Sequence, residues 1–358
     1  MKKRSIVLVA ILSLVALLVM GLSCAPAPPP AEEEVAPPEE EEVAPPEEEV
    51  APPEEEEYPT RAIEVINGHG PGSGSDMTLR AILPGVEEIL GVEMPITYMP
   101  GGATAVAQAY VQKQPADGYT IFECSSDLSC GLALGRLPGS LDDWILIQCN
   151  THEISCIHTR TRKAPAKPFA DSWEEVVEYS QANPKAAITV AGSGLMGVDH
   201  FWVALLAAQS GVNLKFIPFD SGGERRASSM GGHTDLHSDE LIDMKGFRDA
   251  GECKPILIGY DEGLELFPDV PCTVELGIDN IVGRWRGVMV KKGTPQYIVD
   301  ILIDAFSQSF ASESYQTYLW EERGHDRPSL RVGSEFQEFA RSEIEVFEDL
   351  AKELGWLE

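Results

Sequence analysis

Basic residues are scarce in this sequence of 358 residues. It has 27 Lys and Arg against 58 Asp and Glu, and its formal net charge is −31. Binding to nucleic acid depends on clustered Lys and Arg that contact phosphates, so this composition argues against a nucleic-acid partner. It does not exclude a small anionic ligand, because such a site depends on the donors around it and not on the total charge.

Several motifs of metal and enzyme chemistry are also missing. The chain has no Cys-x-x-Cys pair and no zinc-type spacing of Cys and His, which argues against a metal site. It has no Gly-Lys-Ser/Thr phosphate loop and no Gly-x-Ser-x-Gly nucleophile elbow. We therefore expect no metal, no cofactor and no catalytic residue.

The first 23 residues predict export from the cytoplasm. Three cations at positions 2–4 precede an almost unbroken apolar run from Ile6 to Leu22, as in a signal peptide. Cys24 stands where a bacterial lipoprotein signal places its lipidated cysteine, so we expect residues 1–23 to be removed and the chain to be anchored to the outside of the cell membrane by lipid on Cys24. The alternative is an uncleaved signal anchor, because about 18 apolar residues can just span a bilayer.

Residues 24–57 contain no aromatic residue, no Lys and no Arg. They repeat runs of Glu with Val-Ala-Pro-Pro, and their 14 Glu account for much of the net charge. Pro blocks helix formation and the Glu runs repel one another, so the segment is predicted to be a disordered, extended tether.

Six further cysteines follow the tether. An even number in an exported chain permits disulfides, but the pairing cannot be read from the sequence, and an anaerobic host would leave all of them reduced. These residues are Cys124, Cys130, Cys149, Cys156, Cys253 and Cys272.

From Tyr58 onward, apolar runs of strand length alternate with amphipathic stretches of helix length. This alternation predicts an α/β fold with mainly parallel sheets flanked by helices, and the length suggests two domains. The predicted strands are Ala62–Ile66, Pro95–Tyr98, Tyr119–Glu123, Ala187–Ala191, Lys215–Phe219, Pro255–Tyr260 and Gly287–Lys291.

Loops rich in Gly and Ser follow five of these strands. In parallel sheets, ligands bind at the carboxyl ends of strands, where the loops lead into helices. Gly lets the backbone approach a ligand closely, and free N–H groups at a helix start favour anions. Five such loops, in both halves of the chain, predict a cleft lined by backbone donors. The loops are 68–76, 100–104, 125–127, 191–194 and 220–223.

One of these loops also fits a dinucleotide fingerprint. Residues 192–197 read Gly-x-Gly-x-x-Gly, and Asp220 stands at the end of the next strand, where a ribose-binding acid is expected. An NAD-dependent oxidoreductase is therefore the enzyme alternative. The predicted export argues against it, because an exported protein meets little free NAD.

Eight short motifs follow one another between residues 58 and 357. Two are the Gly-rich loops of the first half, and the others include Asp-Gly-Tyr-Thr and Gly-Thr-Pro. The motifs are Tyr58-Pro-Thr-Arg-Ala-Ile-Glu-Val, Pro71-Gly-Ser-Gly-Ser-Asp76, Pro100-Gly-Gly-Ala, Ala116-Asp-Gly-Tyr-Thr120, Gly192-Ser-Gly through His200, Ile217-Pro-Phe with Gly231-Gly-His-Thr-Asp235, Phe267-Pro-Asp-Val-Pro271, and Lys292-Gly-Thr-Pro295.

Together these motifs resemble the extracytoplasmic receptors of tripartite tricarboxylate transporters, the Bug-type (TctC-like) family. The resemblance implies two α/β lobes, in a periplasmic-binding-protein-like architecture, that close like a flytrap over an organic anion. Lobe one would comprise residues 58–160 and 285–358, and lobe two residues 161–284. It also implies that the closed receptor, expected to be a monomer, delivers its ligand to integral membrane subunits of the transporter.

In this family the ligand carboxylate is held by the first two loops of lobe one, partly through ordered water, and by matching loops of lobe two. The matching residues here are Gly72, Ser73, Gly74, Asp76, Gly102, Ala103, Thr104, Ser125 and Ser126 in lobe one, and Ser193, Gly194, His200, Asp220, Ser221, Gly222 and Asp239 in lobe two.

The ligand itself is left open by the sequence. His69 stands where the family commonly has Phe, and Asp220 occupies a position that is often basic. An acidic Asp220 would repel a second carboxylate or attract an amine, so mono-, di- and tricarboxylates, amino acids and aromatic acids all remain candidates. A purely structural surface lipoprotein is the third alternative, although it would not need Gly-lined loops in both halves.

Overall fold

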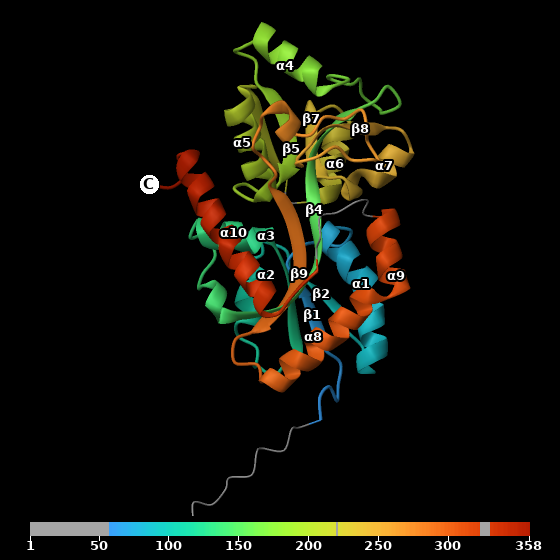
Figure 1. The fold of residues 1–358 in the computed structure, drawn as a ribbon, viewed down its shortest axis with the longest axis vertical. Coiled ribbons are helices and arrows are strands. Elements are labelled where there is room, and N and C mark those ends of the chain that lie inside the picture. The colour runs from blue at the N-terminus through green and yellow to red at the C-terminus, as the bar shows by residue number, and fades with distance from the viewer. Residues whose placement is uncertain (1–56, 220, 323–329) are drawn as a thin grey trace, which may run out of the picture. The chain divides into compact units, whose positions relative to one another are not determined.

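A computed structural model describes residues 57–219, 221–322 and 330–358 (Figure 1). The described residues belong to one compact unit. The predicted signal peptide, the lipidated Cys24, the tether up to residue 56, and Asp220 lie outside the described residues.

A first group of strands is parallel, as the alternation of strands and helices predicts. β1 pairs with β2 on one side and with β3 on the other. Each strand is followed by a helix, and parallel neighbours bring the starts of these helices to one edge of the sheet. The elements are β1 (Glu64–Asn67), α1 (Gly74–Leu90), β2 (Ile96–Tyr98), α2 (Ala105–Val111), β3 (Thr120–Ser125) and α3 (Ser126–Ala133).

A second group repeats this arrangement later in the chain. β5 pairs in parallel with β6 and with β7, and helices again follow the strands. The elements are α4 (Trp173–Ala182), β5 (Ile188–Ser193), α5 (Val198–Ser210), β6 (Leu214–Phe219), α6 (Gly222–Met230), β7 (Leu236–Glu240), η2 (Ile242–Met244), α7 (Lys245–Asp249), β8 (Cys253–Ile258) and η3 (Val274–Leu276).

Two long antiparallel strands connect the groups, as Figure 1 shows. β9 lies between β3 and β4, while the last residues of β4 pair with β7 and β8, so the strand order is β2-β1-β3-β9-β4-β7-β5-β6. The remaining elements are η1 (Leu141–Asp143), β4 (Trp144–Arg160), β9 (Gly283–Lys291), α8 (Gln296–Ala311), α9 (Glu313–Thr317), η4 (Tyr318–Glu322), β10 (Arg331–Val332) and α10 (Ser334–Glu353).

The α/β binding-protein fold is confirmed, and the sheet proves to be mixed. The pairs among β1, β2 and β3 and among β5, β6 and β7 are parallel, as the alternation of strands and helices predicts, while β4 and β9 add antiparallel pairs at the centre. β4, β7 and β10 were not predicted, because β4 and β7 carry polar residues at many positions and β10 has only two residues. The boundaries of the two lobes stay a prediction.

Alternate residues of the first strands face opposite layers of helices, as the two-residue period of a strand requires. Val65 and Ile121 belong to the cluster packed by α1 and α8, whereas their neighbours Ile66 and Phe122 belong to the cluster packed by α2, α3 and α10. A third cluster fills the second group beneath α4 and α5.

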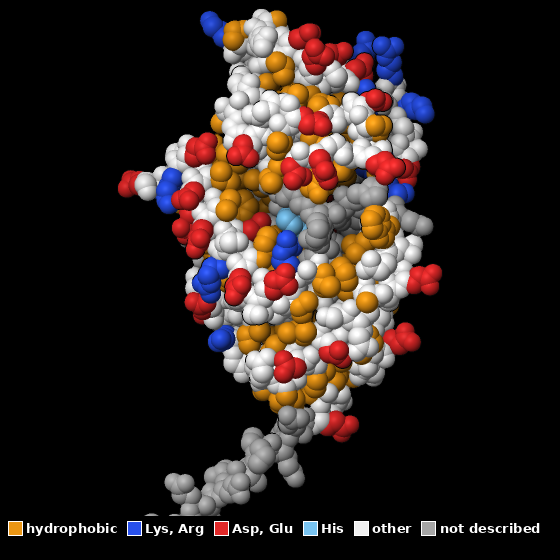
Figure 2. All heavy atoms as spheres, viewed as in Figure 1, with side chains coloured by type: hydrophobic (Ala, Val, Ile, Leu, Met, Phe, Trp, Pro, Cys, Tyr) orange, Lys and Arg blue, Asp and Glu red, His pale blue; other side chains and the backbone are white. Residues whose placement is uncertain are grey.

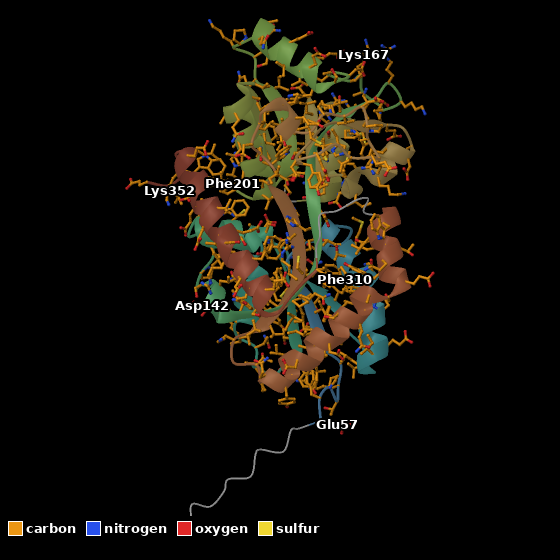
Figure 3. All side chains as sticks on the ribbon, in the orientation of Figure 1. Glu57, Asp142, Lys167, Phe201, Phe310 and Lys352 are labelled. Atoms are coloured by element: carbon orange, nitrogen blue, oxygen red, sulfur yellow. The ribbon has the colours of Figure 1, made fainter. Side chains whose placement is uncertain are left out.

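A smaller apolar cluster joins the two groups along one side. Phe201 of α5 contacts Phe347 of α10 at a ring-centroid distance of 4.9 Å and Trp356 at 4.8 Å. Val198 of α5 and Cys130 of α3 belong to the same cluster. Figure 3 labels Phe201 beside α10, which extends from the first group to meet α5.

All six cysteines after Cys24 are buried and free, so no disulfide joins any two of them. The structure therefore corresponds to the reduced alternative. Among the helices of the described residues, none is both long enough and apolar enough to cross a membrane.

Candidate functional site

The loop between β1 and α1 is organised by Asp76. The Gly72 amide donates to Asp76 Oδ2 at 2.8 Å, and the Asp76 amide donates to Ser73 Oγ at 3.3 Å, which caps the helix. Burial opposes ionisation of Asp76, but the bonds from Gly72, Tyr98 and Arg80 outweigh it and lower its pKa. Asp76 is thus an internal acceptor that shapes the loop.

This network decides which amides of the loop are free for a ligand. The Ser73 amide closes a turn with the Gly70 carbonyl at 3.2 Å, so it is already used. Gly74 and Ser75 begin α1, and amides in a first helical turn have no partner within the helix. A Cβ on Gly74 would overlap the guanidinium of Arg286, so any other residue there would have to displace that side chain.

The loop before α2 is held in an unusual backbone conformation. Gly101, Gly102, Ala103 and Thr104 have φ values of 135°, 58°, 50° and 75°. Non-glycine residues rarely adopt positive φ, and a β-branched Thr is strained there, at a cost of about 1–3 kcal/mol. Gly102 and Ala103 are exposed and Thr104 is buried, so the first two present their backbone to solvent.

Ser125, the last residue of β3, and Ser126, the first residue of α3, are buried and bond within the protein. Ser125 Oγ accepts the Asp127 amide at 3.3 Å and caps α3. Ser126 Oγ donates to the Gly283 carbonyl at 3.4 Å and accepts the Trp285 amide at 2.9 Å. They connect the start of α3 to β9.

Ser193 and Gly194 lie together at the end of β5. The Ser193 amide donates to Asp199 Oδ2 at 2.7 Å, and Gly194 is left-handed with φ 60°. The glycines of the dinucleotide-like motif have structural roles: a Cβ on Gly192 would overlap the Phe216 ring, and Gly197 is the N-cap of α5.

His200 is sandwiched between two aromatic rings. Its ring stacks on Phe216 and on Trp356, each at 4.5 Å between centroids. Its Nδ1 accepts the Met196 amide at 3.0 Å, so the proton of the neutral ring lies on Nε2. Burial and the charge of Arg136 lower the pKa of His200 to about 4, and so His200 is neutral at pH 7.

Around α6, the predicted residues play two different roles. Ser221 Oγ caps the helix by accepting the Glu224 amide at 3.4 Å, and Gly222 is its first residue. Asp239 is fully buried, and its carboxylate accepts from Arg225 at 2.6 Å and from Arg226 at 3.3 Å. Asp239 is part of β7, so its bonds to the two arginines attach α6 to β7.

His69 is a cation in the first loop. Its Nδ1 lies 3.6 Å from Glu123 and 3.3 Å from Ser75 Oγ, and its Nε2 lies 3.5 Å from Asp127. Burial favours the neutral ring, but Asp127 and Glu123 outweigh burial and raise the pKa of His69 to about 9. The side chain is 28% exposed, so it brings positive charge to the surface of the loop.

The centre of the site contains two arginines that were not among the residues predicted from the sequence. Arg284 and Arg286 begin β9 on the same face of the strand, and their side chains are at most 5% exposed. Arg286 contacts Glu153 through Nη1, and its Nη2 lies 3.6 Å from Glu240 and 3.5 Å from Asp243. The available signal was Arg-x-Arg directly before the predicted strand 287–291, which the structure extends back to Gly283.

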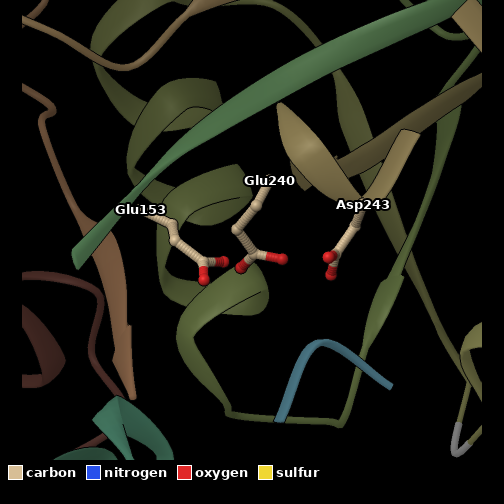
Figure 4. A group of neighbouring side chains, drawn as sticks. All are labelled: Glu153, Glu240 and Asp243. Carbon is tan, nitrogen blue, oxygen red and sulfur yellow. The ribbon is translucent and has the colours of Figure 1, made fainter. Parts of the chain in front are cut away.

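Glu153, Glu240 and Asp243 lie side by side in Figure 4, with one carboxylate oxygen of each within 4.8 Å of the others. Three buried carboxylates are a common set of ligands for a hard cation. Here the Arg286 guanidinium contacts all three, and so it supplies positive charge at this point.

Contacts connect three of these regions: Gly74 lies against Arg286, and Arg286 and Arg226 of α6 both lie 3.5 Å from Asp243. The exposed backbone of 102–103 and the first amides of α1 belong to the first group, and the capped start of α6 belongs to the second. Ser126 and Asp239 are buried, and their side chains bond to other groups of the protein. Figure 2 shows acidic side chains spread over the viewed face, which agrees with the net negative charge.

A family model described as TctC, tripartite tricarboxylate transporter family receptor, matches residues 78–355. Protein BugT of Bordetella pertussis is 21% identical over 303 residues, which cover 83% of this chain and 90% of BugT. MatC from Rhodopseudomonas palustris, solved with bound malate, superposes with a TM-score of 0.70 at 23% identity and covers 82% of this chain and 99% of its own. A second R. palustris protein, solved with adipate, gives 0.74 at 22% identity and covers 84% and 99%.

Proposed function

The chain belongs to the tripartite tricarboxylate transporter receptor family, which comprises solute-binding receptors and not enzymes, and on this basis we propose that it captures a small organic carboxylate outside the cytoplasm for a membrane transporter. The observation that carries the proposal is the match of the family model to residues 78–355, most of the folded part of the chain. Membership in this family sets aside the NAD-dependent oxidoreductase and the purely structural lipoprotein.

The ligand carboxylate is proposed to bind at backbone donors and not at an arginine. Arg225 and Arg284 each contact two or more carboxylates of the protein itself, and their side chains are 5% exposed. The first amides of α1, the backbone at Gly102 and Ala103, and the start of α6 at Ser221 and Gly222 are the donors offered. Helix N-termini favour anions because their N–H groups and dipole point at the ligand.

His69 adds positive charge to the first of these loops. Its imidazolium stands beside α1, so a carboxylate at the start of that helix meets both the helix dipole and a cation. Malate and adipate are bound by two relatives and are the natural first probes.

Thermal shift and calorimetry with malate, adipate, a set of mono- and tricarboxylates, and amino acids test the proposal. We expect at least one carboxylate to raise the melting temperature in a saturable way, as linkage requires for a native-state ligand. NAD and NADP at millimolar concentration serve as the opposing arm. A rise with NAD and none with any carboxylate would reject the receptor in favour of the dinucleotide alternative.

The exposed Ala103 provides a matched pair of variants for the location of the site. Ala103→Glu places a negative charge beside the donors, whereas Ala103→Gln adds nearly the same volume without charge. We expect the Glu variant to weaken binding of the identified carboxylate clearly more than the Gln variant. Equal affinities would place the ligand away from this loop.

Anchoring and delivery are further parts of the proposal. The signal-like run before Cys24 supports processing and lipid attachment at that residue, and the family implies a partner in the membrane. Mass spectrometry of membrane-extracted protein should find an acylated Cys24 at the N-terminus. An intact Met1 would favour the signal anchor.

A further inference from the structure

Arg284 bonds to four side chains that come from four different segments. Its Nε donates to Glu240 Oε1 at 2.7 Å, and its Nη1 donates to Asp127 Oδ2 at 2.5 Å. Its Nη2 donates to Ser193 Oγ at 3.0 Å and to Asp199 Oδ1 at 3.1 Å. Arg284 is the second residue of strand β9, and β9 connects the two groups of strands.

These contacts come from both groups of strands. Asp127 is in the first turn of α3, in the first group, whereas Ser193, Asp199 and Glu240 lie at strand ends and a helix start of the second group. Asp127 also reaches across directly, because its Oδ1 lies 3.5 Å from the Val198 amide at the start of α5. The starts of α3 and α5 are therefore joined by the Asp127 carboxylate, which is 13% exposed, and by one buried guanidinium.

The position of Asp127 is chemically similar to that of a ligand anion. A carboxylate that accepts from a helix N-terminus and from an arginine is the arrangement by which binding sites hold anions. In this chain the protein supplies that carboxylate itself.

We propose that Arg284 is a positioning residue of the ligand site, which holds the loop 193–199 against the start of α3 through Asp127 and so holds the two groups together. The inference rests on the proposed function only in that these loops flank the ligand. A carboxylate then binds at α1 and α6 to loops that are already held in place, which lowers the conformational entropy lost on binding.

Hydrogen exchange in the full chain without ligand tests the bridge. Asp127→Asn keeps the shape of the side chain and removes its charge, and Arg284→Met removes the guanidinium. We expect amides of 126–134 and 193–200 to exchange about tenfold faster or more in both variants, because local opening is easier there. Amides of β1 and β5 should keep their protection.

Arg284→Lys is the conservative variant and should give an intermediate rate. A single ammonium cannot reach Asp127, Asp199 and Glu240 at once, although it keeps the charge. If Arg284→Met does not fold, Asp127→Asn and Arg284→Lys carry the test.

Arg160 supplies a matched control. It is buried like Arg284, but it donates to carbonyls of Lys167, Ser229 and Thr234, all within the second group. Arg160→Met should speed exchange in the second group without singling out 126–134. The proposal is overturned if Asp127→Asn and Arg284→Lys leave 126–134 and 193–200 unchanged, or if they speed exchange everywhere as a general loss of stability does. Because no ligand is present, these outcomes are independent of a failure to find a carboxylate.

Discussion

Gly74 illustrates, at the scale of single residues, how tightly charged side chains pack behind the ligand loops. A side chain there would have to displace the Arg286 guanidinium, which is held by Glu153, Glu240 and Asp243. Overfilling a packed interior costs about 1–3 kcal/mol. We therefore expect Gly74→Ala to lower the free energy of unfolding by about this amount, measured by urea denaturation.

Gly70 provides the control for this substitution, because it lies in the same loop. A Cβ on Gly70 would meet nothing within 4 Å, and its φ is not in the left-handed region. Gly70→Ala should change the free energy of unfolding by no more than about 0.5 kcal/mol. Equal losses for the two variants would mean that the loop, and not the contact with Arg286, is sensitive.

His69 should make stability depend on pH in the alkaline range. Its pKa is raised from 6.5 to about 9 in the folded protein, so the charged ring is favoured by folding. This contribution, on the order of 1–3 kcal/mol, is fully present below about pH 6.5 and is lost as pH rises through 9. The difference in unfolding free energy between wild type and His69→Gln should therefore shrink between about pH 6 and pH 10.

His200 gives the opposite dependence and serves as the comparison. Its pKa is lowered to about 4, so its contribution is present above about pH 6.5 and is lost as pH falls toward 4. The His200→Gln difference should stay constant over the alkaline range. If the His69→Gln difference also stayed constant there, Glu123 and Asp127 would not be holding a charged ring.

At the scale of helices and strands, the sequence predicts the outer parts of the fold better than the centre. The parallel strands are short apolar runs that end in Gly-rich loops, and these signals are local. β4 runs through Gln148, Asn150 and Thr151, which contradict an apolar strand, and its partners are far away in the sequence. Such a strand can be recognised as buried only when the groups that bond to its polar side chains are known.

The same reason explains what the sequence could predict of the site. Gly102 and the start of α1 follow from turn chemistry, which is encoded within a few residues. The cluster of Arg284, Asp127 and Glu240 joins Arg284 to residues 44 and 157 positions away, and no spacing within one segment reveals it. Ser126 illustrates the converse, since its loop position suggested a ligand contact whereas its hydroxyl bonds to β9.

The apolar contact between α5 and α10 should be a strong stabilising element. Phe201 is fully buried against Phe347 and Trp356, and removing a buried Phe costs about 3–5 kcal/mol. We expect Phe201→Ala to lower the free energy of unfolding by this amount in urea. Val346→Ala, on an exposed position of the same helix α10, should change it by less than about 0.5 kcal/mol.

A loss from Phe201→Ala no greater than that from Val346→Ala would contradict this packing. The C-terminal residues after α10 would then make no energetic contribution to the second group. Far-ultraviolet circular dichroism of both variants would exclude a change of fold as the reason.

At the scale of the whole molecule, six buried thiols predict an unreactive native state. Burial raises the pKa of these cysteines, and the thiolate is the reactive form. In a chain with Cys24→Ser, iodoacetamide at about pH 8 should label none of them in the native protein, and all six after unfolding in urea. Labelling of native protein at any of these positions would mean that its surroundings open readily.

The place of β9 in the sheet determines when the molecule can be completed. β9 is the last long strand to be synthesised, yet it lies between β3 and β4, which precede it by more than 120 residues. Until residue 291 has left the ribosome, both earlier strands expose unpaired backbone edges, which are prone to pair with other chains. A chain of this topology therefore gains from staying unfolded until synthesis has passed residue 291, because the insertion of β9 completes its central sheet.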